Sequence, residues 1–276
     1  MGFVLYPHHE HDSYRLEAGR DVGALVINGF TGTPRGVRGL ADALHGAGIT
    51  TIAPHLPGFG IDRKHLHRVR WKDWMTTARA AWDGMQVEFG ERVLVGYSMG
   101  GAIALRLAAE IQPDRLVLIA PFWKVNDWRE PAISLLRHVI PIVPFGPTGD
   151  FADAAVRAHF ASWRPDLDLD DPEVQAALRD DALVPSIAIN ELRKLGRGGP
   201  KRAAHITAPA LVLQGERDDV VPSRNTRRLL APYAGPLAWR TLPGDHFPLR
   251  PDAADWPVAR DAIVEFATGA RVEARV

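Results

Sequence analysis

The most informative stretch of this sequence is Arg92-Val93-Leu94-Val95-Gly96-Tyr97-Ser98-Met99-Gly100-Gly101. Residues 92–97 form a short, mostly apolar run, which predicts a strand buried on both faces. Small and apolar residues over 99–111 predict a helix that begins directly after Ser98. A tight, strained turn between strand and helix requires small neighbours, and it would expose Ser98 at the carboxyl edge of a sheet. Taken alone, the pattern also fits an ordinary glycine-rich turn.

Short apolar runs on either side of this stretch predict the rest of a sheet. They cover residues 24–27, 50–53, 115–120 and 210–214, with a weaker candidate at 238–242. Helical spacing of apolar residues falls between and after them, at 36–45, 71–89, 224–230 and 253–266. Strands that alternate with helices are typical of an α/β fold with a mostly parallel central sheet, and right-handed crossovers place helices on both of its faces.

Residues 122–201 interrupt this alternation. They contain no good strand, and they hold eight of the 22 prolines together with three tryptophans. We therefore expect a core made of residues 1–121 and 202–276, with residues 122–201 inserted as a mainly helical cap. The alternative is a separate domain, although about 80 residues with so many helix breakers would form a thin core of their own.

Composition excludes several kinds of chemistry. The 276 residues include 33 basic and 33 acidic side chains, so the formal net charge is zero, which argues against a nucleic-acid partner. There is no cysteine, which excludes disulfides, thiolate metal sites and a cysteine nucleophile. The first residues do not resemble a secretory signal, and no apolar run approaches the roughly 20 residues of a membrane span. We expect a cytoplasmic monomer or homodimer without stable membrane insertion.

Two later strands end in residue types that would activate Ser98. A serine needs a base to take its proton, and the base needs an acid that orients it. Asp218 follows the run 210–214, and His246 follows the run 238–242. The order serine, acid, histidine along the chain is the one that strand–turn–helix serine sites use. The agreement of three residue types with three strand ends predicts a Ser98–His246–Asp218 triad.

Two neighbouring carboxylates compete for the role of the acid. Asp219 is adjacent to Asp218, but it lies farther from the strand end and also fits a solvated loop or a helix cap. Asp245 precedes His246 directly, and we expect it to hydrogen-bond the turn that holds the histidine. Asp218 is therefore the preferred acid.

A flexible loop after the run 24–27 is a candidate for an oxyanion hole. It reads Asn28-Gly29-Phe30-Thr31-Gly32-Thr33-Pro34. An oxyanion hole combines the backbone N–H of the residue after the nucleophile, here Met99, with an N–H from such a loop, here that of Phe30. Without a triad, the same loop would be interpreted as an ordinary turn with Pro34 at a helix start.

Together these motifs resemble those of the α/β-hydrolase superfamily. They are the loop at 28–32, the loop Ala53-Pro54-His55-Leu56-Pro57-Gly58-Phe59-Gly60, the serine turn at 96–101, and the segments 215–222 and 244–246. Within the superfamily, the chain is similar to small bacterial carboxylesterases and monoacylglycerol lipases over about residues 22–266. Two positions depart from that pattern, because Asn28 and Phe59 stand where these enzymes commonly have histidine. Asn28 can still hydrogen-bond the loop, so we expect the oxyanion hole to be retained.

The resemblance implies hydrolysis of short- to medium-chain acyl esters through an acyl-serine, a reaction of lipid metabolism. Ser98 would attack the acyl carbonyl, His246 would move the proton, and Asp218 would fix the histidine tautomer. The implied partner is a small acyl ester, and neither a metal nor an organic cofactor is implied. A thioesterase, an amidase or a carbon–carbon hydrolase would use the same triad. An α/β-hydrolase that serves as a receptor or interaction module without catalysis is the alternative from another class.

Two further sets of residues carry weaker expectations. Trp123, Trp128, Ile140, Val143 and Phe145 are apolar enough to line an acyl pocket under the cap, and they equally fit a core for the cap itself. The histidines fall near the amino terminus (His8, His9 and His11) and in a basic stretch (His65 and His67). We interpret them as solvated rather than as metal or anion ligands.

Overall fold

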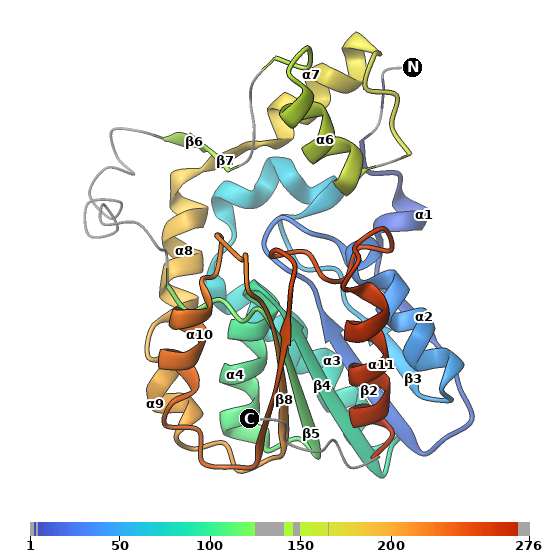
Figure 1. Ribbon diagram of the computed structural model, residues 1–276, viewed down its shortest axis with the longest axis vertical. Helices are drawn as coiled ribbons and strands as arrows, with labels where there is room; N and C mark the ends of the chain where they lie inside the picture. The colour runs from blue at the N-terminus through green and yellow to red at the C-terminus, as the bar shows by residue number, and fades with distance from the viewer. Residues whose placement is uncertain (1–2, 4, 125–140, 146–149, 165, 270–276) are drawn as a thin grey trace.

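The protein is built around a mostly parallel sheet (Figure 1). The computed structural model describes residues 3, 5–124, 141–145, 150–164 and 166–269. The described strands of this sheet lie in the order β1-β3-β2-β4-β5-β8-β9. Their bounds are β1 Tyr14–Leu16, β2 Val22–Ile27, β3 Thr50–Ala53, β4 Glu91–Tyr97, β5 Arg115–Ile119, β8 Ala210–Gly215 and β9 Leu237–Leu242. The helices outside the region of the expected cap are α1 His8–His11, η1 Pro34–Val37, α2 Arg38–Gly46, η2 Gly60–Arg68, α3 Trp71–Gln86, α4 Met99–Ile111, α10 Ser223–Leu230 and α11 Trp256–Ala267.

The register of the parallel strands brings their carboxyl ends to one edge. Ile27 of β2 pairs with Gly96 of β4, and Tyr97 pairs with Ile119 of β5. The next two strands continue the series, because Ile119 at the end of β5 pairs with Leu213 of β8, and β8 pairs with β9 up to their final residues. The residues that follow β2, β4, β5, β8 and β9 therefore emerge side by side.

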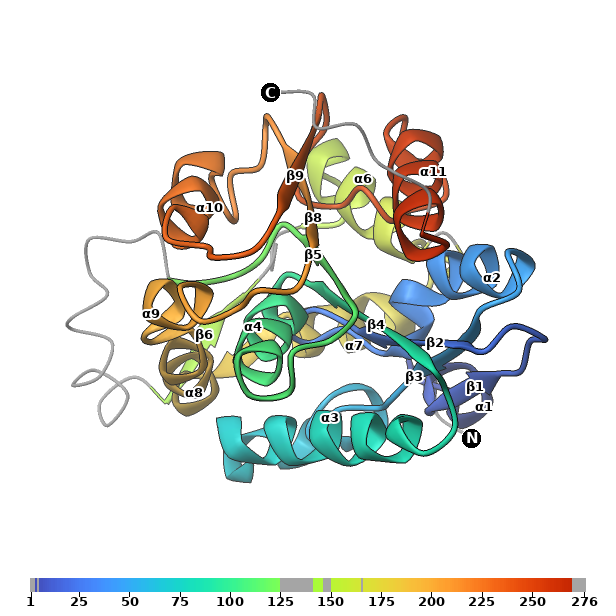
Figure 2. The same cartoon turned by 90° about the horizontal axis from the view of Figure 1, so that it is seen from below.

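Apolar side chains cover both faces of the sheet. On one face, β2, β4, β5 and β8 pack against α2 and α11, with Leu40 and Ile263 in a buried cluster. On the other face, Trp74 of α3 and Leu105 of α4 belong to a second cluster. Figure 2 shows the two groups of helices on opposite sides of the strands. This confirms the predicted α/β fold, because a continuous apolar run marks a strand with two covered faces.

Three short strands in the described part of the chain are not predicted by the sequence pattern. β1 has three residues and pairs antiparallel with β3 at the edge of the sheet. β6 (Ile142–Pro144) pairs antiparallel with β7 (Leu183–Pro185), so the expectation of no strand within 122–201 is wrong. Both of these strands contain proline, which ordinarily argues against a strand, and three residues are too few to show alternation.

The segment between β5 and β8 also contains four described helices, namely α6 Ala154–Trp163, α7 Pro172–Asp181, α8 Ser186–Gly196 and α9 Gly199–Ala203. Phe160 of α6 and Leu178 of α7 form a small buried cluster with Leu5 and Tyr6 from the amino-terminal segment. Figure 1 shows α6, α7 and the β6–β7 ribbon together at the upper end of the molecule, beyond the main sheet. Within the described residues, every helix falls short of the length and hydrophobicity that a membrane span requires.

Candidate active site

Ser98 lies at a strained turn between β4 and α4. Its backbone angles are φ 53° and ψ −114°, outside the regions that non-glycine residues ordinarily adopt. The turn is this tight because β4 and α4 almost touch. A Cβ on Gly96 would overlap the carbonyl oxygen of Gly100, and a Cβ on Gly100 would overlap that of Ile27. The Ser98 amide donates to the carbonyl of Ile119 at 2.9 Å, which fixes the turn to β5.

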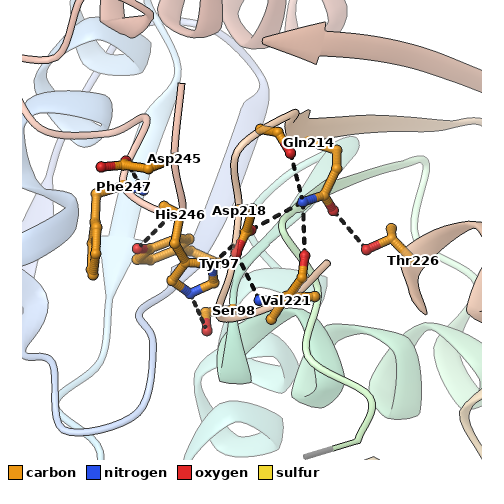
Figure 3. Close-up of polar contacts among 10 residues, drawn as sticks. Tyr97, Ser98, Gln214, Asp218, Val221, Thr226, Asp245, His246 and Phe247 are labelled. Carbon is orange, nitrogen blue, oxygen red and sulfur yellow. Dashed lines mark hydrogen bonds and ion pairs between the residues drawn. The ribbon is translucent and has the colours of Figure 1, made fainter. Parts of the chain in front are cut away.

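His246 connects Ser98 to a buried carboxylate. Its Nε2 lies 2.9 Å from Oγ of Ser98, and its Nδ1 lies 2.8 Å from Oδ2 of Asp218 (Figure 3). Asp218 is an acceptor, so Nδ1 carries the proton and Nε2 is free to accept from the serine hydroxyl. His246 and Asp218 are 3% and 4% exposed, which keeps water from competing for these bonds. The structure thus brings the three predicted residues into one hydrogen-bonded series.

Asp218 accepts two further hydrogen bonds. The Val221 amide donates to its Oδ1 at 2.6 Å, and the Gln214 side chain donates to its Oδ2 at 3.0 Å. A buried carboxylate needs such donors, because burial alone disfavours its charge. The neighbouring Asp219 is exposed. The geometry therefore selects Asp218, the preferred acid in the sequence, to face His246.

The loop that carries His246 is held by residues on three sides. Asp245 accepts the Phe247 amide at 2.8 Å, which is the turn contact expected for it. Asp255, which precedes α11, accepts the Gly244 amide at 2.6 Å. Tyr97 donates its hydroxyl to the carbonyl of His246 at 3.0 Å. Burial, followed by the nearby Asp218 and Asp245 carboxylates, raises the pKa of Tyr97, so its hydroxyl remains a donor.

The loop after β2 lies against the serine turn. A Cβ on Gly29 would be 3.3 Å from Cβ of Ser98. The Asn28 side chain donates to the carbonyls of Gly29 and Gly32 at 3.0 and 2.7 Å, so it does bond the loop as expected. The Met99 amide begins α4, where the first N–H groups have no acceptor within the helix. The loop that contains Phe30 and the start of α4 therefore flank Ser98.

An aromatic cluster surrounds the Phe30 side chain. Its ring makes edge contacts with Phe59, Trp74 and Phe145, with centroids 5.5, 6.0 and 5.0 Å away. Phe145 directly follows β6, and it is 43% exposed. Phe59 is fully buried in this cluster.

The other predicted pocket residues divide into two groups. Trp123 and Val143 are partly buried and pack against the cluster that covers the α3–α4 face of the sheet. Trp128 and Ile140 lie outside the described residues. Val143 lies in β6, the short strand that precedes Phe145.

The histidines outside the site follow a different pattern. His65 and His67 are exposed in η2, as expected for solvated side chains. His11 is instead buried, and its Nδ1 lies 2.8 Å from Oγ1 of Thr33, so the expectation of a solvated side chain is wrong for this residue. Burial, followed by the positive charge of Arg164, lowers the pKa of His11 to about 4. Among the described residues, no three His, Asp or Glu side chains are grouped as metal ligands.

A serine on a strand–turn–helix, with an acid and a histidine after later strands of a mostly parallel sheet, defines an α/β-hydrolase. The family model described as "Serine aminopeptidase, S33" matches residues 23–235. The chain belongs to this family of α/β-hydrolases.

Three known proteins show the extent of the similarity. The chain is 29% identical over 204 residues to a thermostable monoacylglycerol lipase of Bacillus sp. strain H-257, which covers 74% of this chain and 73% of the relative. It is 31% identical over 148 residues to a monoacylglycerol lipase of Mycolicibacterium smegmatis, covering 50% of this chain and 48% of that protein. A solved structure described with the metagenome-derived lipolytic enzymes LipS and LipT superposes with a TM-score of 0.76 at 20% identity, covering 94% of this chain and 98% of that chain, which shows the shared fold.

Proposed function

We propose that this protein is a serine ester hydrolase of the carboxylesterase or monoacylglycerol lipase type, acting on short- to medium-chain acyl esters. The observation that carries the proposal is the continuous hydrogen-bonded series from Ser98 through His246 to Asp218. The lipase names of two relatives support an ester as the substrate class. The triad residues by themselves do not distinguish an ester from an amide or a thioester.

The reaction follows from the position of each proton. His246 accepts the Ser98 hydroxyl proton at Nε2 while Oγ attacks the acyl carbonyl carbon. The carbonyl π electrons move to its oxygen, which forms a tetrahedral oxyanion. Asp218 holds the Nδ1–H tautomer and stabilises the imidazolium. His246 then donates its proton to the leaving alcohol as the C–O bond breaks, which leaves an acyl-serine. A water molecule gives a proton to His246 and attacks the acyl carbon, which forms a second tetrahedral oxyanion. As this intermediate collapses, the C–Oγ bond breaks, His246 returns the proton to Oγ of Ser98, and the carboxylic acid is released.

Backbone amides would stabilise the oxyanion. We assign this role to the N–H groups of Phe30 and Met99, because Gly29 approaches Ser98 on one side and α4 begins on the other. Removal of one oxyanion donor typically costs about 10² to 10³ in kcat. The side chain of Asn28 would preserve this geometry through its two bonds to the loop.

The acyl or alcohol part of the substrate would lie between the loop after β2 and the segment 122–201, which we interpret as a cap. Of the five proposed lining residues, Phe145 contacts the Phe30 ring, and Trp123 and Val143 pack against the core. Trp128 and Ile140 stay in the proposal on sequence grounds alone. Ligands of α/β folds bind beyond the carboxyl ends of the strands, and Phe145 contacts Phe30 in the loop that follows the carboxyl end of β2.

A chain-length series tests the proposal. We would measure hydrolysis of p-nitrophenyl esters from acetate to palmitate and of a matching p-nitroanilide, with wild type, Ser98→Ala and the control Ser13→Ala. Ser13 is exposed and lies before β1, so its variant should act as wild type does. Ester activity that peaks at short or medium chains and is lost only in Ser98→Ala supports the proposal. Cleavage of the anilide without the esters would replace it with an amidase, and activity retained in Ser98→Ala would reject it.

A further inference from the structure

Gln214 is a buried polar residue in a strand that is otherwise apolar. It precedes the last residue of β8, and it is 1% exposed. Side chains alternate along a strand, so Gln214 faces the same side as Val212, which belongs to the cluster with α3 and α4. An amide at such a position destabilises the fold unless its polar atoms are all bonded. Its retention among apolar neighbours needs an explanation.

The contacts of the side chain determine the orientation of the amide. Nε2 lies 3.0 Å from Oδ2 of Asp218 and 3.0 Å from the carbonyl of Val221, with the Gly215 carbonyl farther away at 3.4 Å. These partners are a carboxylate and carbonyls, which accept and cannot donate, so the atom facing them must be nitrogen. Oε1 accepts the Thr226 hydroxyl at 2.6 Å. Figure 3 shows this network directly behind Asp218, as seen from His246.

We propose that Gln214 is a positioning residue for the triad, because it donates to the same carboxylate oxygen that receives the proton-bearing nitrogen of His246. The proposal rests on the catalytic role assigned to Asp218. Two donors on Oδ2 and the Val221 amide on Oδ1 hold the carboxylate in one orientation. The Gln214 dipole also compensates part of its negative charge. Loss of this donor would leave more of the charge to act on His246, and the imidazolium would hold its proton more tightly.

A purely structural role for Gln214 makes a different prediction. The Thr226 and Val221 contacts tie β8 to the loop and helix that follow, and their loss would lower stability without any effect on His246. The proton affinity of the imidazole therefore separates the two roles. It responds to the donor on Asp218 and not to the contacts of Oε1.

The experiment is an NMR pH titration of the His246 imidazole in the whole protein, together with the pH profile of kcat/KM. Gln214→Met removes the donor at similar size. Gln214→Asn keeps an amide that is one methylene too short to reach Oδ2. In both variants we expect the titration midpoint and the acidic limb to move to higher pH by about 0.5 unit or more. Because the titration needs no substrate, it decides the role of Gln214 even if the protein proves inert toward esters.

Two control variants separate the donor from general effects. Thr226→Val removes the partner of Oε1 and leaves the Asp218 contact in place. Gln112→Met removes the same amide from a contact with the His205 carbonyl, after the carboxyl end of α4 and before β5. Both controls should keep the wild-type midpoint. An unchanged midpoint in either folded Gln214 variant, or an equal shift in Thr226→Val, would overturn the proposal.

Discussion

Replacing Asp218 by asparagine should inactivate the enzyme, because both oxygens of the carboxylate accept hydrogen bonds. Oδ1 accepts from the Val221 amide, and Oδ2 accepts from Gln214 and His246. An asparagine supplies one acceptor and one donor in the same space. Either orientation of the new amide therefore creates at least one contact between two donors.

The two orientations have different costs. With the NH₂ group toward Val221, a buried N–H loses its acceptor, which costs about 1–3 kcal/mol. With the NH₂ group toward His246, the histidine must present an unprotonated Nδ1, so Nε2 carries the proton and no longer accepts from Ser98. In both cases the charge that stabilises the imidazolium is gone. We expect kcat/KM to fall by about 10³- to 10⁴-fold.

The assay is initial-rate hydrolysis of a short-chain p-nitrophenyl ester by wild type, Asp218→Asn and Asp219→Asn. The second variant is the matched control, because Asp219 is the adjacent carboxylate and is exposed. It should retain activity within about threefold of wild type, as surface substitutions usually have small effects. A mild loss in Asp218→Asn with a severe loss in Asp219→Asn would show that the acid has been assigned to the wrong residue.

Three other predictions concern the serine turn, the amino-terminal segment and the proposed cap. Gly100→Ala would force a methyl group into the backbone at the end of β2, so thermal unfolding should show a loss of about 3 kcal/mol or more, whereas wild-type stability would refute the close approach. His11 has its pKa lowered from 6.5 to about 4, so below pH 6.5 the unfolded chain binds a proton that the folded chain does not, and stability falls as the pH drops toward 4. Urea unfolding at pH 7 and 4.5 should show that wild type loses about 2 kcal/mol more than His11→Asn, and equal losses would contradict the buried neutral histidine. Phe145→Ala removes an aromatic ring that would contact the acyl chain, so KM for a medium-chain ester should rise about 2- to 10-fold. Ile142 is an exposed residue of the same ribbon, so Ile142→Ala should leave KM unchanged. Equal effects of the two substitutions would remove Phe145 from the pocket.

The serine turn was predictable from sequence because its geometry admits few residue types. Gly96 and Gly100 are required by the close approach of β4, α4 and β2, and the apolar run before Ser98 marks a strand covered on both faces. Asp218 and His246 were predictable for a related reason. The carboxyl ends of parallel strands lie at one edge of the sheet, so residues that directly follow these strands are close in space. The residue types at those positions were therefore enough to predict Asp218 and His246 as partners.

The residues that orient the triad were not predictable in the same way. Gln214 is a single polar residue at the end of an apolar run, and its partner Thr226 lies in the following helix. Asp255 reaches the His246 loop from before α11, and the Tyr97 hydroxyl reaches it from β4. These contacts depend on side-chain directions across different elements, which no local pattern contains. The lone polar residue at the end of β8 is the signal from which such a partner could have been suggested.

The proposed chemistry depends on Ser98 being a nucleophile that His246 activates. The most direct test is labelling with a fluorophosphonate, followed by mass spectrometry of the intact protein and of the peptide that contains Ser98. We predict that wild type gains one label on Ser98, and that Ser98→Ala and His246→Ala gain none in the same time. A wild-type protein that stays unlabelled, or that carries the label on another residue, would show that Ser98 is not an activated nucleophile.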